Sequence, residues 1–165
     1  VRLFINLSTD KAVDSSTLYG TTKQLTERLT SWAGVHNEKT KFANIRFGNV
    51  MNSRGNVFEI WDEELKKKKP LSITHPLVER YFFQIEEATD FILKCLPLVT
   101  TGEIFVPKMK SYKIKDLAKK YSKKYKIIGL RQGEKIKEEL ITQRERKSAV
   151  EKKDMWIINS YINKQ

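Results

Sequence analysis

The fold of this chain is organised around residues 8–23, which read STDKAVDSSTLYGTTK. Residues 2–7 before them, RLFINL, are mostly apolar, as is typical of a buried strand of a parallel sheet. The carboxyl end of that strand would present residues 8–11, which carry two hydroxyls, a carboxylate and an ammonium group. We therefore interpret this strand end as a candidate active site.

A helix is predicted to follow, up to Gly34, which we interpret as its stop signal. Its apolar residues recur at near-helical spacing: Leu18, Leu25, Leu29 and Trp32. Asp14, Ser15 and Ser16 are its possible caps.

Tyr19 and Lys23 lie one turn apart on one face of this helix. A phenolate is favoured when an ammonium group lies within a few ångströms, so Tyr19 could take a proton from a substrate hydroxyl. The alternative is a half-buried ring beside a solvated charge, since short motifs match by chance in a lysine-rich chain.

Four further motifs follow in order: RFGNV at 46–50, SRGNV at 53–57, THP at 74–76 with RYF at 80–82, and GLRQGEK at 129–135. With STDKA at 8–12, they resemble the extended short-chain dehydrogenase/reductase superfamily. Within it the chain is similar to the UDP-N-acetylglucosamine 4,6-dehydratases of polysaccharide and flagellin-glycan biosynthesis. The resemblance extends to about Leu140.

This resemblance implies an α/β fold, namely the carboxyl-terminal part of a Rossmann-like parallel sheet plus a small α/β substrate-binding lobe. We expect residues 1–50 to hold the remaining part of the NADP-binding domain, and residues 51–165 to form mainly the lobe, with some segments returning to the sheet. No G-x-G-x-x-G turn, which holds the pyrophosphate in such sheets, occurs in the sequence. We therefore expect part of a longer enzyme that does not hold NADP by itself.

The resemblance also implies roles for the residues of the strand end. Tyr19, with Lys23, would deprotonate the hydroxyl on carbon 4 of the sugar and contact the cofactor, NADP or NAD, while Thr9 would hydrogen-bond the same oxygen. Asp10 and Lys11 are the candidates for removing the proton on carbon 5 and protonating the hydroxyl that leaves carbon 6; which does which stays open. Retaining relatives have Asp-Glu here, so Asp10-Lys11 favours inversion at carbon 5.

Two candidate substrate-binding residues follow the strand predicted at 42–47. Asn49 would lie beyond its carboxyl end, where ligands bind in open α/β sheets; the alternative is an asparagine in a tight turn. Arg54 precedes a helix start and suits a phosphate, or it pairs with a surface carboxylate.

Three more candidates lie further along the chain. Arg80 stands among aromatic residues and could grip a diphosphate, or pack its stem on the rings. Arg131 would bind phosphate charge and Glu134 the ribose hydroxyls, while Glu134 could also cap a helix running to about Ile141.

The remaining pattern predicts helices at 57–65, 86–96 and 114–121 and strands at 71–73, 102–107 and 155–158.

Composition limits the class of protein. The chain has 165 residues, 39% of them hydrophobic, and no apolar run reaches the ~20 residues of a membrane span. Cys95 is the only cysteine and falls in an apolar helical pattern, so we expect a small core residue, a reducing compartment and a cytoplasmic location. His75 has no second ligand candidate nearby, so we expect no metal.

The net charge of +12 arises largely from lysines at 66–69 and 108–126. A helical apolar stripe at 114–121 places many of these on a solvated face, so we expect no nucleic-acid or membrane partner for this segment. The resemblance implies a UDP-sugar substrate and a homo-oligomer, in bacterial or archaeal surface glycan biosynthesis. The alternatives are a sugar-nucleotide 4-epimerase of the same superfamily, or a truncated non-catalytic remnant or basic nucleic-acid-binding module.

Overall fold

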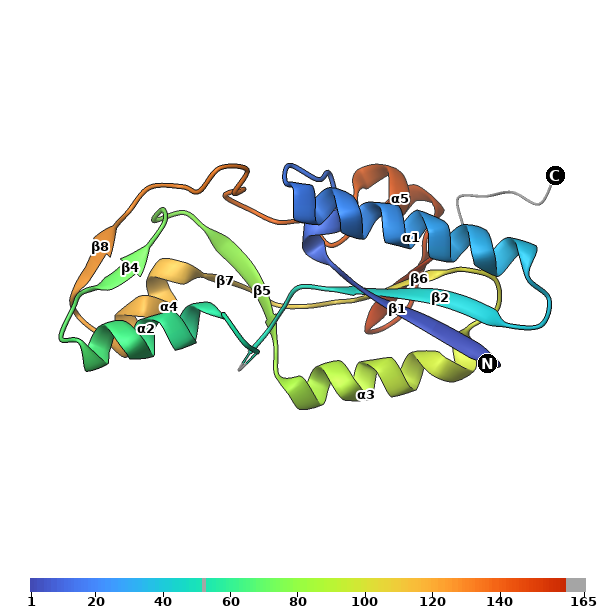
Figure 1. Cartoon of the computed structure of the whole chain (residues 1–165), viewed down its shortest axis with the longest axis horizontal. Helices are drawn as coiled ribbons and strands as arrows, with labels where there is room; N and C mark the ends of the chain where they lie inside the picture. Colours follow the sequence, from blue (N-terminus) through green and yellow to red (C-terminus); the bar gives the residue numbers. More distant parts are fainter. Residues whose placement is uncertain (52, 160–165) are drawn as a thin grey trace. The chain divides into compact units, whose positions relative to one another are not determined.

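A computed structural model describes residues 1–51 and 53–159 and divides them into two compact units (Figure 1). The first unit comprises residues 1–47, 89–108 and those from 139 onward, and the second comprises 48–88 and 109–138. The fold is α/β, as predicted.

The first unit contains a five-stranded sheet of order β1-β2-β6-β10-β9. The strands are β1 (Leu3–Thr9), β2 (Lys41–Phe47), β6 (Ile104–Pro107), β9 (Val150–Glu151) and β10 (Met155–Ile158). β1, β2 and β6 are parallel, whereas β10 pairs antiparallel with both β6 and β9. The four strands that the sequence predicted in this sheet, at 2–7, 42–47, 102–107 and 155–158, are confirmed as β1, β2, β6 and β10.

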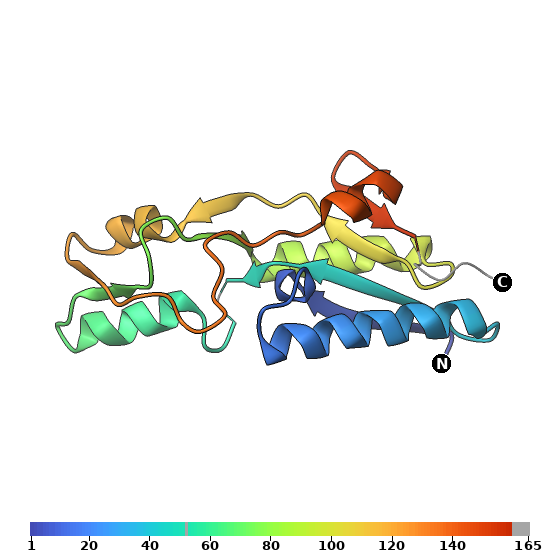
Figure 2. The same cartoon turned by 90° about the horizontal axis from the view of Figure 1, so that it is seen from above.

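Helices cover both faces of this sheet. α1 (Leu18–His36) and α5 (Gln143–Ser148) lie on one face, and the part of α3 (Ile85–Cys95) from Thr89 onward lies on the other (Figure 1). Seen from above, α1 runs along β1 and β2 (Figure 2). A 3₁₀ turn, η1 (Asp10–Ala12), connects β1 toward α1.

The ends of α1 differ from those predicted. Its N-cap is Thr17, whose hydroxyl accepts a hydrogen bond from the Gly20 amide at 3.1 Å. Gly34 does not stop the helix, which continues to His36. Instead Gly34 lets the helix approach the loop before β6, because a Cβ added there would lie 2.5 Å from the Gly102 nitrogen.

The side of α1 that faces the sheet is small and polar rather than apolar. Glu27, Ser31 and Gly34 are buried there. The buried Asn44 of β2 donates to the Glu27 carbonyl and the Ser31 hydroxyl, both at 3.1 Å, and Ser31 donates to the Gly102 carbonyl at 2.7 Å. Directional polar contacts therefore attach this helix to the sheet.

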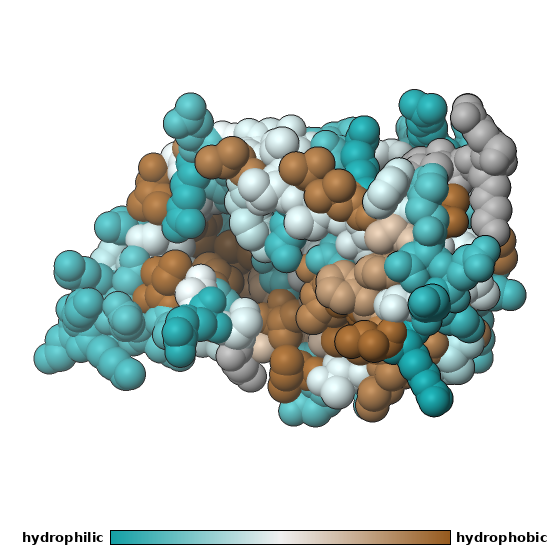
Figure 3. Space-filling model, turned by 45° about the vertical axis from the view of Figure 1, so that its right-hand side comes forward, coloured by the Kyte–Doolittle hydropathy of each residue, from teal (hydrophilic) through white to brown (hydrophobic). Residues whose placement is uncertain are grey.

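The predicted apolar stripe of α1 is present but exposed. Leu18 is 83% exposed, and Leu25, Leu29 and Trp32 are each more than half exposed. Phe4 and Leu7 of the edge strand β1 are also exposed, and hydrophobic side chains are visible on the surface (Figure 3). The stripe thus lies opposite the face that packs on the sheet.

The second unit is built from short elements. They are the sheet β3-β5-β7 (Asn49–Val50, Glu79–Phe83 and Ser111–Lys113), the parallel pair β4-β8 (Leu71–Ile73 and Tyr125–Ile127), and the helices α2 (Val57–Lys66) and α4 (Ile114–Tyr121). Its core is apolar and aromatic: Phe58, Trp61, Leu71, Ile73, Val78, Phe82, Ile114 and Ala118 are all buried. The Trp61 indole also donates to the Ser72 carbonyl at 2.9 Å.

Cys95 at the end of α3 is completely buried, as expected of a small core residue. Burial raises the pKa of its thiol to about 12, to which the nearby charge of Asp154 adds. Within the described residues, no helix combines the length and the hydrophobicity needed to cross a lipid bilayer.

Candidate active site

The strand end after β1 forms a compact polar cluster. The Asp10 carboxylate is fully buried, and its Oδ1 accepts hydrogen bonds from the Thr9 hydroxyl at 2.9 Å and the Lys11 ammonium at 3.0 Å. Asp10 Oδ2 has no hydrogen-bond partner among the described residues. The Lys11 side chain remains 34% exposed, so of the two charged groups only Lys11 reaches the surface.

Tyr19 and Lys23 lie in the first two turns of α1. The Lys23 ammonium donates to the Leu7 carbonyl of β1 at 2.9 Å, which attaches the helix to the strand. Tyr19 is 54% exposed. Its hydroxyl makes no hydrogen bond within the described part of the chain, so it is open to a ligand.

Lys23 has the donors that a nicotinamide ribose needs. An ammonium group has three N–H donors, and the contact with Leu7 uses one of them. The remaining two, with the exposed Tyr19 hydroxyl, fit the hydroxyls of a ribose. The residues present are therefore compatible with the nicotinamide half of the cofactor that the fold implies.

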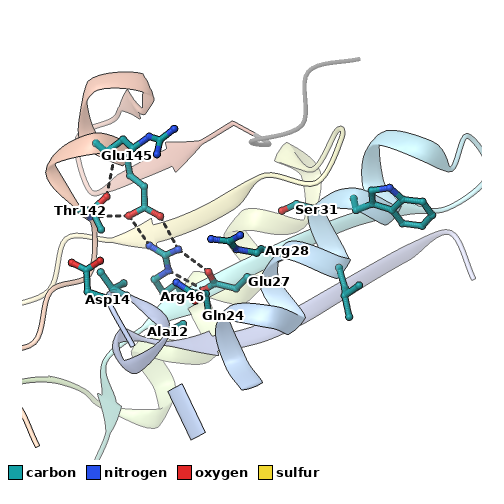
Figure 4. Close-up of a pocket in the computed structure, with 13 residues that line it drawn as sticks. Ala12, Asp14, Gln24, Glu27, Arg28, Ser31, Arg46, Thr142 and Glu145 are labelled. Carbon is teal, nitrogen blue, oxygen red and sulfur yellow. Dashed lines mark hydrogen bonds and ion pairs between the residues drawn. The ribbon is translucent and has the colours of Figure 1, made fainter. Parts of the chain in front are cut away.

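A buried ion network joins β2, α1 and α5 (Figure 4). Arg46 of β2 contacts Glu27 of α1 through Nε and Nη2, at 2.9 and 2.7 Å. It contacts Glu145 of α5 through Nη1 and Nη2, at 3.1 and 2.9 Å, and donates to the Leu140 carbonyl at 3.1 Å. We call Glu27, Arg46 and Glu145 the ion triad.

Burial alone would lower the pKa of Arg46, but its hydrogen bonds and charge interactions with Glu27 and Glu145 outweigh that effect and raise it. The guanidinium is therefore permanently charged, between two carboxylates that are each less than 8% exposed.

A pocket of about 690 Å³ adjoins the ion triad, between α1, the turn after β1 and α5 (Figure 4). Trp32 and Leu29 supply apolar walls, and Arg28 and Arg144 supply charge. None of the candidate catalytic or substrate-binding residues predicted from the sequence lines this pocket.

The structure brings three of the predicted substrate-binding residues together in the second unit. The Glu134 carboxylate accepts from Arg80 Nη2 at 3.0 Å, from the Thr74 hydroxyl at 2.9 Å and from the Arg131 amide at 3.0 Å. Arg80 is 9% exposed and also donates to the carbonyls of Glu79 and Ile136.

The expectation that Glu134 caps a helix is wrong. No helix occurs between residues 128 and 141. Residues there pair with a strand instead: Lys137 forms a β-bridge with Glu79, whose amide donates to the Ile136 carbonyl at 2.8 Å.

Asn49 and Arg54 are not part of the Glu134 cluster. Asn49 donates to the Tyr81 carbonyl at 3.0 Å, which leaves its side-chain oxygen available. Arg54 is exposed, next to Gly55 with φ of 75° and before Asn56, which caps α2. Within residues 1–51 and 53–159, no group of three His, Cys, Asp or Glu side chains could hold a metal ion.

The sequence-based prediction missed the ion triad. Two signals were available: a charged residue, Arg46, inside the otherwise buried run of β2, and the spacing Thr142-x-x-Glu145, which forms a capping box. Neither signal identifies the partner of Arg46, since Glu145 lies 99 residues away in the sequence.

Comparison with known proteins identifies one family and several relatives that match most of this chain. The sequence matches the family described as "Polysaccharide biosynthesis protein" over residues 1–160. An uncharacterized membrane protein of Methanocaldococcus jannaschii, MJ1061, is 43% identical over 98% of this chain and 53% of its own length. The inverting UDP-N-acetylglucosamine 4,6-dehydratase of Campylobacter jejuni is 38% identical over 86% of this chain and 44% of its own.

A UDP-glucose 4-epimerase of Rickettsia bellii is also 38% identical, over 86% of this chain and 44% of its own length. Among solved structures, Pen from Bacillus thuringiensis superposes with a TM-score of 0.91 at 32% identity, over 98% of this chain and 54% of that one. The chain thus spans about half the length of the relatives it matches.

Proposed function

Because the chain belongs to the polysaccharide biosynthesis protein family, we propose that it carries the catalytic and substrate-binding residues of a UDP-N-acetylglucosamine 4,6-dehydratase. The observation that supports this most is the cluster of Thr9, Asp10 and Lys11 at the end of β1, preceding a helix that presents Tyr19 and Lys23. A simple oxidoreductase needs only Tyr19, Lys23 and a hydroxyl group, whereas elimination of water needs further groups that transfer protons.

The first step is removal of the proton from the hydroxyl on carbon 4 of the sugar, which we assign to Tyr19 with the charge of Lys23 nearby. Thr9 now donates its proton to Asp10 and would have to turn that donor toward the carbon 4 oxygen to hydrogen-bond it as the proton leaves. A bound nicotinamide cofactor, NADP or NAD, supplies the hydride acceptor and donor at this site.

The second step is loss of water across carbons 5 and 6. We assign removal of the carbon 5 proton to Lys11 acting as a neutral amine, because its side chain reaches the surface while the Asp10 carboxylate does not. The ammonium formed would give a proton to the hydroxyl that leaves carbon 6 as water. Carbon 6 would then take back the hydride, and carbon 5 would be reprotonated from the opposite face. Asp10 holds the Lys11 ammonium in place through Oδ1. The pair Asp10-Lys11, where retaining relatives have Asp-Glu, supports inversion at carbon 5.

For the UDP group, we assign phosphate contacts to Arg54 and Arg131, which are exposed. Arg80 is held by Glu134 and two carbonyls, so it would contact a diphosphate only by sharing its guanidinium with these partners. Glu134 would bind the ribose through the oxygen that now contacts the Arg131 amide, and Asn49 would contact the sugar nucleotide through its free amide oxygen.

We also propose that the protein is a homo-oligomer that works in the cytoplasm in surface-glycan biosynthesis. The exposed stripe of α1 supports self-association, since such stripes on a helix are typical of helix–helix interfaces.

The test is to express the whole protein, with any residues that precede Val1 in its gene, and to incubate it with UDP-N-acetylglucosamine. We expect a product lighter by one water in the mass spectrum. An epimerase, which the Rickettsia relative makes the second candidate, would give a product of unchanged mass.

Two variants separate the steps. Tyr19→Phe should block every step, including transient reduction of the cofactor measured by absorbance. Lys11→Ala should keep that transient but slow dehydration and solvent exchange at carbon 5 by roughly 100-fold or more, the usual scale for removing a general base. Deuterium exchange at the parent rate in Lys11→Ala would contradict the role of Lys11.

A further inference from the structure

The ion triad uses the full hydrogen-bonding capacity of one arginine. A guanidinium group has five N–H donors, and those of Arg46 go to Glu27, Glu145 and the Leu140 carbonyl in five contacts of 2.7–3.1 Å. The contacts to each carboxylate are bidentate, which fixes orientation as well as distance. Arg46 thereby joins β2, α1 and α5 at one point.

Two residues of the ion triad, Arg46 and Glu27, lie near the candidate catalytic residues, one across the sheet and the other along α1. Arg46 is the sheet partner of Ser8, and the next pair is Thr9 with Phe47. Glu27 lies one helical turn after Lys23 and two turns after Tyr19. A rotation of α1 about its axis would therefore move Glu27 and the two catalytic side chains together.

Apolar packing does not fix that rotation. The leucines and Trp32 of α1 are exposed, and its buried side carries Glu27, Thr30, Ser31 and Gly34. The orientation of the helix depends on polar contacts, among which the bidentate pair of Glu27 with Arg46 has two hydrogen bonds from a buried charge.

Glu145 holds the other side of Arg46. It is the third residue of α5, where its carboxylate accepts from the Thr142 amide at 2.7 Å while its own amide donates to the Thr142 hydroxyl at 3.0 Å. The capping box thus restricts the Glu145 side chain to an orientation in which its carboxylate contacts Arg46.

We propose that Glu145 is a positioning residue, which acts through Arg46 and Glu27 to hold α1 in the orientation that places Tyr19 and Lys23 for proton transfer. The inference rests on the proposed function, because it concerns the same catalytic side chains. It adds that α5, far along the chain, is part of the device that sets catalytic geometry.

The test uses Glu145→Gln in the whole protein, which keeps the side-chain shape but presents an amide N–H to an arginine donor. We expect kcat for the UDP-sugar to fall about 10-fold or more with KM unchanged, since misplacing a catalytic group by about 1 Å costs up to 100-fold. Amide hydrogen exchange in residues 18–27 should rise about 10-fold, whether or not substrate is present.

The matched control is Ile158→Ala, which destabilises the same unit by removing a completely buried side chain of β10 and changes none of the three residues of the ion triad. When the urea unfolding midpoint of Ile158→Ala is lowered as much as that of Glu145→Gln, the control should keep the parent's kcat and the parent's amide exchange in residues 18–27. Glu27→Gln combined with Glu145→Gln should lose less activity than the product of the two single losses, because both act through Arg46.

The proposal is overturned if Glu145→Gln matches Ile158→Ala in kcat and in exchange of α1 at equal stability. The exchange measurement needs no turnover. If the parent protein forms no keto-sugar, the proposed function fails on its own, and the exchange of α1 still decides whether Glu145 holds the helix.

Discussion

The two units hold their helices by different means. In the first, α1 meets the sheet through the ion triad, Asn44 and Ser31, and leaves its leucines exposed. In the second, α2 and α4 pack an apolar core around Phe58 and Trp61. Apolar burial is non-directional and tolerates small shifts, whereas bidentate ion pairs define one orientation. The directional attachment is found on the helix that carries the candidate catalytic residues.

Removal of Arg46 is the strongest test of the claim that the ion triad holds α1 on the sheet of the first unit. Arg46→Ala leaves two buried carboxylates without their counter-charge, so we expect unfolding free energy to fall by about 3–5 kcal/mol. The urea midpoint measures it. A loss no larger than that of an exposed arginine, such as Arg144→Ala, would contradict the importance of the ion triad.

Trp61→Phe tests the apolar core of the second unit. The change keeps an aromatic ring but removes the donor to the Ser72 carbonyl and some buried volume, so we expect a loss of roughly 2 kcal/mol. Amide exchange in residues 18–27 should not change, since α1 belongs to the other unit. Increased exchange there would break the distinction between the units.

Thr142→Ala asks how much the capping box contributes to the ion triad. The box should stabilise α5 by about 1 kcal/mol, which is the usual cost of losing an N-cap hydroxyl. Thr142→Ser keeps the hydroxyl and serves as the control, with a urea midpoint near that of the parent. An equal loss in both variants would mean that the hydroxyl does not act as a cap.

Leu25→Gln should have the smallest effect on stability. Leu25 is 55% exposed and glutamine is a good helix former, so the urea midpoint should stay within about 0.5 kcal/mol of the parent. Self-association, measured by sedimentation, should weaken. Unchanged association would remove the support that the exposed stripe gives to a homo-oligomer.

Local sequence was enough to predict where the candidate catalytic residues lie, whereas their roles come from the family resemblance and stay predictions. Thr9, Asp10 and Lys11 are adjacent in the chain, and Tyr19 and Lys23 lie one turn apart, so a strand end and a helix period place them. The ion triad could not be predicted in this way, because its contacts join residues 19 and 99 positions apart. Periodicity likewise identified the stripe of α1 but not which side of the helix meets the sheet.

The contact between Gly34 and Gly102 also constrains how this sequence can change over time. A Cβ at Gly34 would lie 2.5 Å from the Gly102 backbone, and one at Gly102, where φ is 87°, would lie 2.5 Å from the Ser31 carbonyl. Neither side can yield, because each obstacle is main chain. In a saturation-mutagenesis library both positions should therefore accept glycine alone. A substitution at one glycine should not be rescued by a substitution at the other. The two glycines are therefore constrained together, although 67 residues separate them in the sequence.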